Sequence, residues 1–210
     1  MKLLFVASDP MEFRGMRRDD DRHLVSNGAG AHHAAAAVDA ALARFHPDAI
    51  VSMGFCGALD PALRIADIVV GTSIFAGTGA FPAQSPVTGA PHRAGAIRSI
   101  DRVASTAAEK SALHATGAIA VEMEAAGVAQ RARTLGLPFF CIKSVTDLAG
   151  ETMANDFNAV LRSDGHFDTM KILALSLRRP WVRLPELVRF RQRCLLAARS
   201  LGEFIADCRF

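Results

Sequence analysis

Two segments of the sequence place carboxylates directly after apolar runs. In the first, Val121–Ala125, two glutamates stand where a buried strand should pass into a helix, as Glu122-Met123-Glu124. Carboxylates in a first helical turn often do no more than complement the helix dipole. That role does not explain why an apolar strand is followed at once by two glutamates, because a carboxylate pointing back to the strand ends is costly to bury unpaired. A ligand with hydroxyl groups would supply the partner.

The second segment delivers a single aspartate. The apolar run Phe139–Val145 predicts a buried strand, and Asp147 follows it after one threonine. Taken alone, such an aspartate is more often the cap of a following turn or helix. Together with Glu122 and Glu124, it indicates a cluster of carboxylates at the ends of neighbouring strands, which favours a functional site.

Two glycine-containing turns could bring backbone close to a ligand. Ser52–Leu59 is a strand that breaks into small residues, where a missing side chain permits close approach. Ser26–Gly30 contains a lone Gly-x-Gly, but the third glycine and the downstream acid of a dinucleotide fingerprint are absent. NAD binding is therefore not expected.

Strand-like and helix-like segments alternate along the chain. Short apolar runs predict buried strands at Leu3–Ala7, Ala49–Met53, Ile68–Val70, Ala118–Val121 and Phe139–Val145. Helical stretches between them are Ala31–Phe45, Glu122–Leu135 and Phe157–Leu177. This pattern predicts an α/β fold, a three-layer α/β/α sandwich with a mostly parallel, twisted central sheet. Ligands in such folds bind where strands end.

Composition predicts an ordinary globular protein. The 210 residues are 50% apolar and 21% charged, with a net charge of +3, so we expect a single domain spanning 1–210, with a basic helical extension at about 180–210. Four scattered cysteines without a CxxC pair or zinc-ligand spacing indicate reduced thiols and no metal site. The apolar N-terminal run is too short for a signal peptide or membrane helix, which favours a cytoplasmic location.

The order and spacing of these segments over about residues 1–175 resemble the superfamily of purine nucleoside phosphorylases and methylthioadenosine/adenosylhomocysteine nucleosidases. The Glu-Met-Glu segment is the most specific element, followed by Ser144-Val145-Thr146-Asp147 after a buried strand, and then by Gly54-Phe55-Cys56-Gly57-Ala58. The resemblance implies an enzyme that cleaves the N-glycosidic bond of an adenine-type nucleoside. It implies no cofactor, apart from inorganic phosphate as co-substrate if the enzyme is a phosphorylase.

The resemblance also implies roles for individual residues. Asp147 matches the general acid that protonates N7 of the leaving purine, and Glu12 matches the acid that activates the attacking water. Glu124 matches the carboxylate that binds the ribose hydroxyls. Further substrate contacts are expected from Met123, Glu122, Phe55, Cys56, Gly57 and Val103. Cleavage builds positive charge on the ribose while electrons flow into the base, so a carboxylate near the sugar and a proton donor near the base both favour the transition state. Burial should keep Asp147 protonated.

The sequence departs from the family pattern near the nucleophile. Many phosphorylases hold phosphate with an arginine and a serine around the Gly-x-Cys-Gly turn, where this chain has Ser52 and Phe55. Loss of a bidentate guanidinium favours water as nucleophile, although Arg14, Arg17 or Arg18 could supply a displaced phosphate site. Phosphorolysis therefore stays open, including that of a lipid nucleoside such as adenosylhopane, the substrate of the hopanoid-associated branch.

The base pocket departs as well. Val103 stands where an aromatic residue often stacks on the purine, so the pocket would be wider or would borrow Phe81 from the Gly- and Pro-rich stretch Ala76–Gly95. This stretch is predicted to be a long loop, either a lid or a poorly ordered surface excursion. Phe55 and Val103 also leave open a nucleoside-binding protein that has lost turnover.

The C-terminal segment Pro180–Phe210 has apolar residues at helical spacing with arginines between them. This amphipathic helix should close over the core or join subunits of a homo-oligomer, a dimer or larger. Contact with an anionic membrane surface is the second interpretation. Nucleic-acid binding is not expected, because no aromatic residues interleave with the arginines. The partners predicted are thus a small nucleoside and further copies of the chain.

Overall fold

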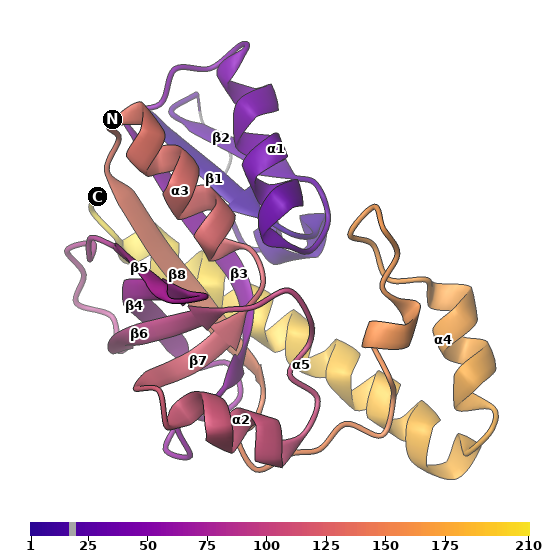
Figure 1. The fold of residues 1–210 in the computed structure, drawn as a ribbon. Helices are drawn as coiled ribbons and strands as arrows, with labels where there is room; N and C mark the ends of the chain where they lie inside the picture. The colour runs from indigo at the N-terminus through magenta and orange to yellow at the C-terminus, as the bar shows by residue number, and fades with distance from the viewer. Residues whose placement is uncertain (17–19) are drawn as a thin grey trace.

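The computed structural model describes residues 1–16 and 20–210. Its strands are β1 (Leu3–Ala7), β2 (Arg22–Ser26), β3 (Ala49–Ala58), β4 (Ile68–Ala76), β5 (Gly79–Pro82), β6 (Arg93–Ser99), β7 (Ala118–Glu122) and β8 (Phe139–Asp147). Its helices are α1 (Ala31–Leu42), α2 (Ala107–His114), α3 (Ala125–Leu135), α4 (Thr169–Ser176) and α5 (Pro180–Asp207), with 3-10 turns η1 (Pro10–Phe13) and η2 (Asn158–Val160) (Figure 1).

The strands form one sheet of mixed direction. Its order is β2-β1-β3-β7-β6-β4-β5, and β8 pairs with both β3 and β4. Pairing is parallel for β1 with β2 and β3, for β3 with β8, for β4 with β6 and for β6 with β7. It is antiparallel for β3 with β7 and for β4 with β5 and β8. The predicted α/β class is confirmed, but the sheet is mixed, with only part of it parallel.

Alternate residues of β1 show how both faces of the sheet are covered. Leu4 and Val6 pack in a cluster with alanines of α1 and α3. Leu3 and Phe5 point the other way and pack in a second cluster with Leu201 and other residues of α5, as side chains of period two must. Figure 1 shows α1 and α3 side by side over one face, while α5 runs behind the sheet towards α4.

Strands β3 and β8 continue beyond the ends predicted for them. β3 runs through the Gly54–Ala58 turn and β8 runs to Asp147, because the two strands pair along most of their length, from Ile50 opposite Phe139 to Gly57 opposite Asp147. The register shifts at Cys56/Gly57. The small-residue turn predicted to approach a ligand is thus a strand end that lies against the aspartate.

Several predicted segments are wrong in detail. The helix expected over Phe157–Leu177 is interrupted by a turn at Gly165, whose φ of 78° suits glycine, and only η2 and α4 are helical. The loop expected over Ala76–Gly95 contains β5 and the start of β6, because its short apolar stretch pairs with β4. β2 was not predicted at all.

The C-terminal helix α5 closes over the sheet. Its second half buries Cys194, Ala197, Ala198, Leu201, Phe204 and Ile205, and this packing agrees with the first interpretation of its amphipathic pattern. In the part of the chain that the structure describes, no helix is both long and apolar enough to cross a membrane. The four cysteines are buried, and each is free.

Candidate active site

A cavity of about 600 Å³ opens at the ends of β1, β3, β7 and β8. The nine residues to which the resemblance gave catalytic or substrate-binding roles all line it, namely Glu12, Phe55, Cys56, Gly57, Val103, Glu122, Met123, Glu124 and Asp147. They come from segments more than a hundred residues apart, which the pairing of β3 with β7 and β8 brings together.

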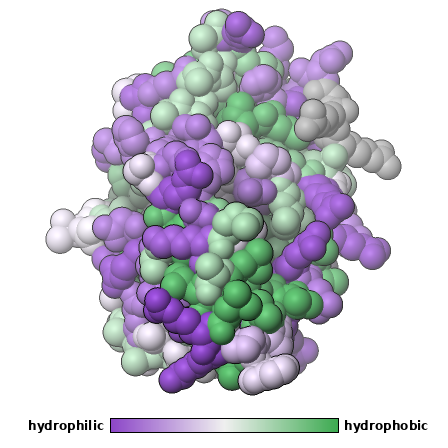
Figure 2. Space-filling view, turned by 90° about the vertical axis from the view of Figure 1, so that its right-hand side faces the viewer, coloured by the Kyte–Doolittle hydropathy of each residue, from purple (hydrophilic) through white to green (hydrophobic). Residues whose placement is uncertain are grey.

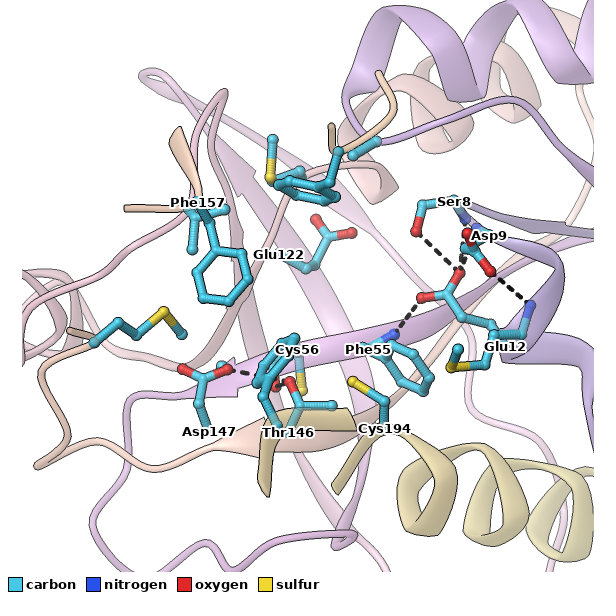
Figure 3. Close-up of a pocket in the computed structure, with 18 of the residues that line it drawn as sticks. Ser8, Asp9, Glu12, Phe55, Cys56, Glu122, Thr146, Asp147, Phe157 and Cys194 are labelled. Carbon is cyan, nitrogen blue, oxygen red and sulfur yellow. Dashed lines mark hydrogen bonds between the residues drawn. The ribbon is translucent and has the colours of Figure 1, made fainter. Parts of the chain in front are cut away.

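Glu12 is held by a ring of hydrogen-bond donors. Its Oε2 accepts from the backbone N–H of Ser8 at 2.7 Å and of Asp9 at 3.1 Å, and from Ser8 Oγ at 3.1 Å. Its Oε1 accepts from the N–H of Phe55 at 2.8 Å (Figure 3). Glu12 is only 2% exposed, and this burial raises its pKa against the nearby charge of Lys143.

Gly54 makes room for that carboxylate. Its φ is 137°, in the region that favours glycine, and a Cβ at this position would lie 2.6 Å from Glu12 Oε1. The close backbone approach inferred from the sequence therefore serves a side chain of the protein itself, because Gly54 lets β3 pass against Glu12.

Glu122 and Glu124 share one buried cation. Lys143 Nζ lies 2.9 Å from Glu122 Oε2 and 3.7 Å from Glu124 Oε2, and the lysine is fully buried. Burial would raise the pKa of Glu122, but Lys143 holds it below its ordinary value. For Glu124, burial and the charges of Glu122 and Glu12 prevail over Lys143 and raise the pKa to about 7. The pKa values of the two carboxyl groups are thus shifted in opposite directions.

Their hydrogen bonds differ too. Glu122 Oε2 accepts from the N–H groups of Glu124 at 2.9 Å and Ala125 at 2.8 Å, so it fixes the start of α3. Glu124 is the N-cap of that helix, and its Oε1 accepts from the N–H of Gly30 at 3.1 Å. Glu122 is therefore engaged in holding the segment in place, whereas Glu124 has fewer protein partners and is the better placed to bind a ligand.

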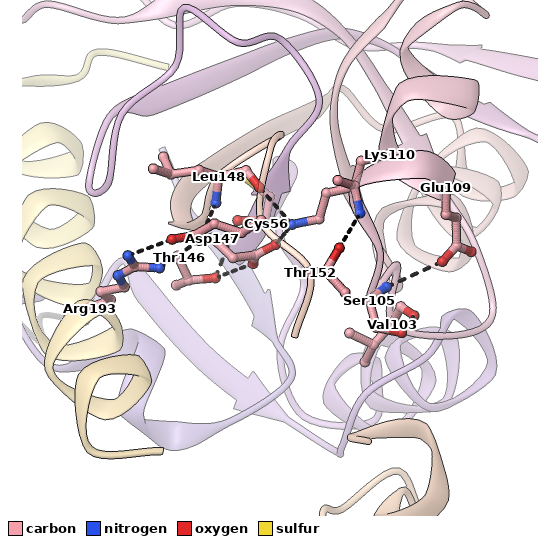
Figure 4. A network of polar contacts seen from close by, with 12 residues as sticks. Cys56, Val103, Ser105, Glu109, Lys110, Thr146, Asp147, Leu148, Thr152 and Arg193 are labelled. Atoms are coloured by element: carbon pink, nitrogen blue, oxygen red, sulfur yellow. Dashed lines mark hydrogen bonds and ion pairs between the residues drawn. The ribbon is translucent and has the colours of Figure 1, made fainter. Parts of the chain in front are cut away.

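Asp147 pairs with a lysine that the sequence did not reveal. Lys110 of α2 is fully buried, and its ammonium contacts Asp147 Oδ2 and donates to the carbonyl of Leu148 at 2.9 Å (Figure 4). Asp147 Oδ1 accepts from Thr146 Oγ1 at 3.1 Å. Burial raises the pKa of Asp147, while Lys110 and its hydrogen bond act in the opposite direction.

Glycine and arginine secure the surroundings of Asp147. A Cβ on Gly57 would lie 2.8 Å from Asp147 Oδ2, so this position in β3 leaves space for the carboxylate. Beyond the strand, Arg193 of α5 donates two hydrogen bonds to Glu151, at 2.7 and 2.8 Å. This ion pair ties the loop that follows Asp147 to the C-terminal helix.

One side of the cavity is apolar. It is lined by Val103, Met153, Phe157, Ile172, Leu187 and Phe190. The rings of Phe157 and Phe190 lie 5.2 Å apart, and Val103 packs against the same cluster. Most of this wall comes from residues after 150, so the chain must return through α4 and α5 before the cavity is complete.

Phe81 is not part of the cavity. Its ring lies under the guanidinium of Arg133, 4.8 Å from the charge centre, and packs against the core beside α3. The suggestion that the 76–95 segment lends an aromatic to the base was wrong, because β5 pins Phe81 opposite Ile74 of β4.

Of the alternative phosphate ligands, the two that the structure describes lie away from the cavity. Ser52 is fully buried in β3, and neither Ser52 nor Arg14 lines the cavity. Arg17 and Arg18 lie outside the residues that the structure describes. Among the described residues, no group of three His, Cys, Asp or Glu side chains is placed to hold a metal ion.

The sequence profile of the phosphorylase superfamily matches residues 13–100 and 87–166 of this chain. The chain belongs to that superfamily. The resemblance carried by the Glu-Met-Glu and Ser-x-x-Asp segments is thereby confirmed.

Curated relatives of this superfamily member include nucleosidases. The 5'-methylthioadenosine/S-adenosylhomocysteine nucleosidase of Anoxybacillus flavithermus is 30% identical over 169 residues, which are 66% of this chain and 73% of the relative. That of Marinomonas sp. (strain MWYL1) is 27% identical over 180 residues, 71% of this chain and 78% of the relative.

Solved structures share the fold over nearly the whole chain. The 5'-methylthioadenosine/S-adenosylhomocysteine nucleosidase of Neisseria meningitidis, in complex with methylthio-immucillin-A, superposes with a TM-score of 0.69 at 19% identity, covering 98% of this chain and 97% of that one. A futalosine hydrolase mutant of Helicobacter pylori has a TM-score of 0.69 at 13% identity, covering 98% and 97%. At such identities the likeness concerns the fold alone.

Proposed function

We propose that this protein hydrolyses the N-glycosidic bond of an adenine-type purine nucleoside. The enzyme class expected from the sequence, cleavage of that bond, is confirmed by the nucleosidase relatives. The choice of water as nucleophile rests above all on Glu12, a carboxylate held by backbone donors in the same cavity as Asp147 and Glu124.

The reaction assigns one task to each of the three carboxyl groups. The bond from C1' of the ribose to N9 of the base breaks, and its electrons pass into the purine, where N7 takes the proton of Asp147. Glu124 binds the ribose hydroxyls and faces the positive charge that develops on the sugar. A water oxygen attacks C1' and loses its proton to Glu12. Charge is stabilised where it arises, which is the main source of catalysis at such sites.

Glu12 argues against phosphate in that position. Its oxygens accept from the N–H groups of Ser8, Asp9 and Phe55, which are the donors that a bound anion would otherwise use. A second anion beside this carboxylate would be repelled at short range, since like charges interact strongly in a buried site. Water has no such penalty.

The deciding experiment follows the products from adenosine, methylthioadenosine and adenosylhomocysteine with and without phosphate. We expect free adenine and free ribose product in both conditions. The variant Glu12→Gln should lose most of the activity, while Glu203→Gln, an exposed carboxylate on α5, should not. Release only with phosphate, with a sugar 1-phosphate as product, would replace hydrolysis by phosphorolysis, and no release at all would overturn the proposal.

The apolar wall of the cavity favours a second candidate substrate. Phe157, Ile172, Leu187 and Phe190 provide a surface far more apolar than a ribose needs. A nucleoside with a bulky apolar 5' group, of which the lipid nucleoside adenosylhopane is an extreme case, would fill it. Adenosines with 5'-alkylthio chains of increasing length test this candidate. Their kcat/KM, measured with and without phosphate, should rise with the length of the chain.

A non-catalytic nucleoside-binding protein would keep the cavity and lose turnover. Asp147→Asn separates this alternative from an enzyme. In an enzyme the substitution should remove turnover and leave nucleoside binding in place, whereas in a binding protein it should change nothing measurable. We also propose a homo-oligomer, a dimer or larger, which sedimentation of the purified chain will test.

A further inference from the structure

A cluster of exposed apolar side chains lies where α4 turns into α5. Trp181 is 90% exposed, Met170 76%, Leu177 67% and Val182 57%. We call these four residues, together with Leu173, the α4–α5 corner. Figure 2 views the molecule from the side of α4 and shows a hydrophobic cluster bordered by hydrophilic side chains. A contiguous apolar surface of this kind commonly marks an interaction site.

The corner faces outward because of helical spacing. Met170, Leu173 and Leu177 follow one another at intervals of three and four residues, which places them on one side of α4. The residues between them, Ile172 and Ser176, are buried against the body of the protein. The inward face of α4 is therefore already filled, and none of the three outward residues belongs to a hydrophobic cluster of the described residues.

The same segment is strongly basic. Between Thr169 and Pro185 the sequence has four cations, Lys171, Arg178, Arg179 and Arg183, and no Asp or Glu. Arg178 and Arg179 are exposed, and no carboxylate of the described residues pairs with either of them. Exposed apolar residues and unpaired cations thus occur together on one corner of the molecule.

We propose that the α4–α5 corner docks on an anionic lipid bilayer. Tryptophan prefers the headgroup region, leucine and methionine enter the upper acyl layer, and the arginines meet the anionic headgroups. A second copy of the chain fits less well, because a two-fold contact would place the same cations against each other. Of the C-terminal amphipathic helix, to which the sequence pointed, only the exposed start at Trp181 and Val182 takes part, since its apolar face at Leu201 and Ile205 is buried in the core.

The corner also borders the cavity. Leu173 belongs to the corner and also lines the cavity. Phe167, which is not part of the corner, lines the cavity too and is 41% exposed. On a docked molecule the apolar wall of the cavity would therefore open next to the lipid. This consequence rests on the proposed function, whereas docking itself does not.

The chain contains a natural reporter for the test, because Trp181 is its only tryptophan. Fluorescence of the full-length protein is recorded with vesicles of phosphatidylcholine alone and with vesicles that also contain phosphatidylglycerol. We expect a blue shift of the emission and co-sedimentation only with the anionic vesicles, both weakened by salt. An unchanged emission together with no co-sedimentation would overturn the proposal.

Variants outside the cavity identify the surface. The double variant Met170→Ser/Leu177→Ser keeps the Trp181 reporter and should bind anionic vesicles more weakly. The double variant Arg178→Glu/Arg179→Glu should also bind them more weakly, by about fivefold for each basic residue lost. Val87→Ser and Arg44→Glu, exposed residues elsewhere, serve as matched controls and should bind as the unaltered chain does. Equal vesicle binding by all variants contradicts the proposal. So does a corner variant that binds vesicles normally but sediments with a smaller mass, because that result would make the corner a contact between two copies of the chain.

A separate measurement keeps docking apart from catalysis. Because none of the four substituted corner positions lines the cavity, cleavage of a small soluble nucleoside should be unchanged in these variants. If the protein proves inactive on every nucleoside, vesicle binding is still measurable and the docking proposal stands or falls on it alone.

Discussion

The ammonium of Lys110 contacts the carboxylate of Asp147 inside the protein, with the lysine fully buried and the aspartate 7% exposed. Asp147 is thus subject to two opposing influences, since burial raises its pKa and Lys110 lowers it. The proposed mechanism requires this group to hold a proton for the leaving base next to a cation. The balance between these two effects should be visible in the pH dependence of the reaction.

Removing the cation should shift the pH profile in a definite direction. In Lys110→Met the carboxyl loses the charge that favours its ionised form, so the pKa of Asp147 should rise. An acid with a higher pKa stays protonated to higher pH, and the alkaline limb of the kcat profile should move up by about one to three pH units. Lys110→Arg keeps the cation and is the control. An unmoved limb in folded Lys110→Met would show that Lys110 does not act on the acid.

Asp147→Asn should lower kcat by about a hundredfold or more, the usual contribution of a positioned acid. The KM should change little, because the proton is needed only as the bond breaks. Asparagine leaves Lys110 without its charge partner, so thermal unfolding must be compared as well. The double variant Lys110→Met/Asp147→Asn has no unpaired buried charge at this position. A return of activity in the double variant would exclude Asp147 as the acid.

Glu124 should set the acidic limb. With a pKa of about 7, this carboxyl takes up a proton as the pH falls, and it then offers less negative charge to the sugar. We expect kcat/KM to decline below a pH of about 7, and Glu124→Gln to be less active with a flatter acidic limb. A full acidic limb in Glu124→Gln would assign it to another group, such as Glu12.

The buried cation Lys143 should matter most for stability at neutral pH. In Lys143→Met, Glu122 and Glu124 lose their common partner, and we expect a loss of about 3–5 kcal/mol in the free energy of unfolding. Without Lys143 the pKa values of Glu122 and Glu124 in the folded state should rise. The loss of stability should therefore develop as the pH increases above the ordinary glutamate pKa of 4.5, which applies to the unfolded chain. Urea unfolding at acidic and neutral pH measures it. Lys171→Met, at an exposed lysine, should show no such dependence.

Gly54→Ala should displace Glu12 without touching the substrate. The added Cβ would meet a Glu12 oxygen at 2.6 Å, at a backbone φ of 137°. We expect kcat to fall at least tenfold and stability to decrease by about 1–3 kcal/mol. Gly89→Ala, where a Cβ meets nothing within 4 Å, is the matched control. Normal turnover by Gly54→Ala would separate Glu12 from activation of the water.

A residue of this site could be predicted from the sequence when it stands near the end of an apolar run, but not when only the tertiary fold brings it to the cavity. Glu124 and Asp147 stand within three residues of the ends of apolar runs, so both the strand-end position and the family pattern pointed to them. Lys143 carried an overlooked signal, because a lysine inside the buried run Phe139–Val145 requires an anionic partner. Lys110 carried none, since it lies in a helix of ordinary composition and meets Asp147 only through the tertiary fold.

The fold shows the same division. Strands that are apolar on both faces, such as β1 and β8, were predicted from local sequence, whereas β2 and β5 depend on pairing with neighbours that a local pattern does not contain. The apolar wall formed by Phe157 and Phe190 was missed for a related reason. These aromatics face one another only because α5 folds back past the loop of residues 148–168.

Strand β8 carries both Lys143, which contacts the two glutamates, and Asp147, the proposed acid for the base, at positions four residues apart. Because the pairing of β8 with β3 places both side chains, a slip of β8 by one residue would move both of them away from their present partners at once. The half of the site proposed for the sugar and the half proposed for the base therefore both depend on the pairing of β8 with β3. A chain with β8 misaligned would lose both halves together, with no partly competent enzyme in between.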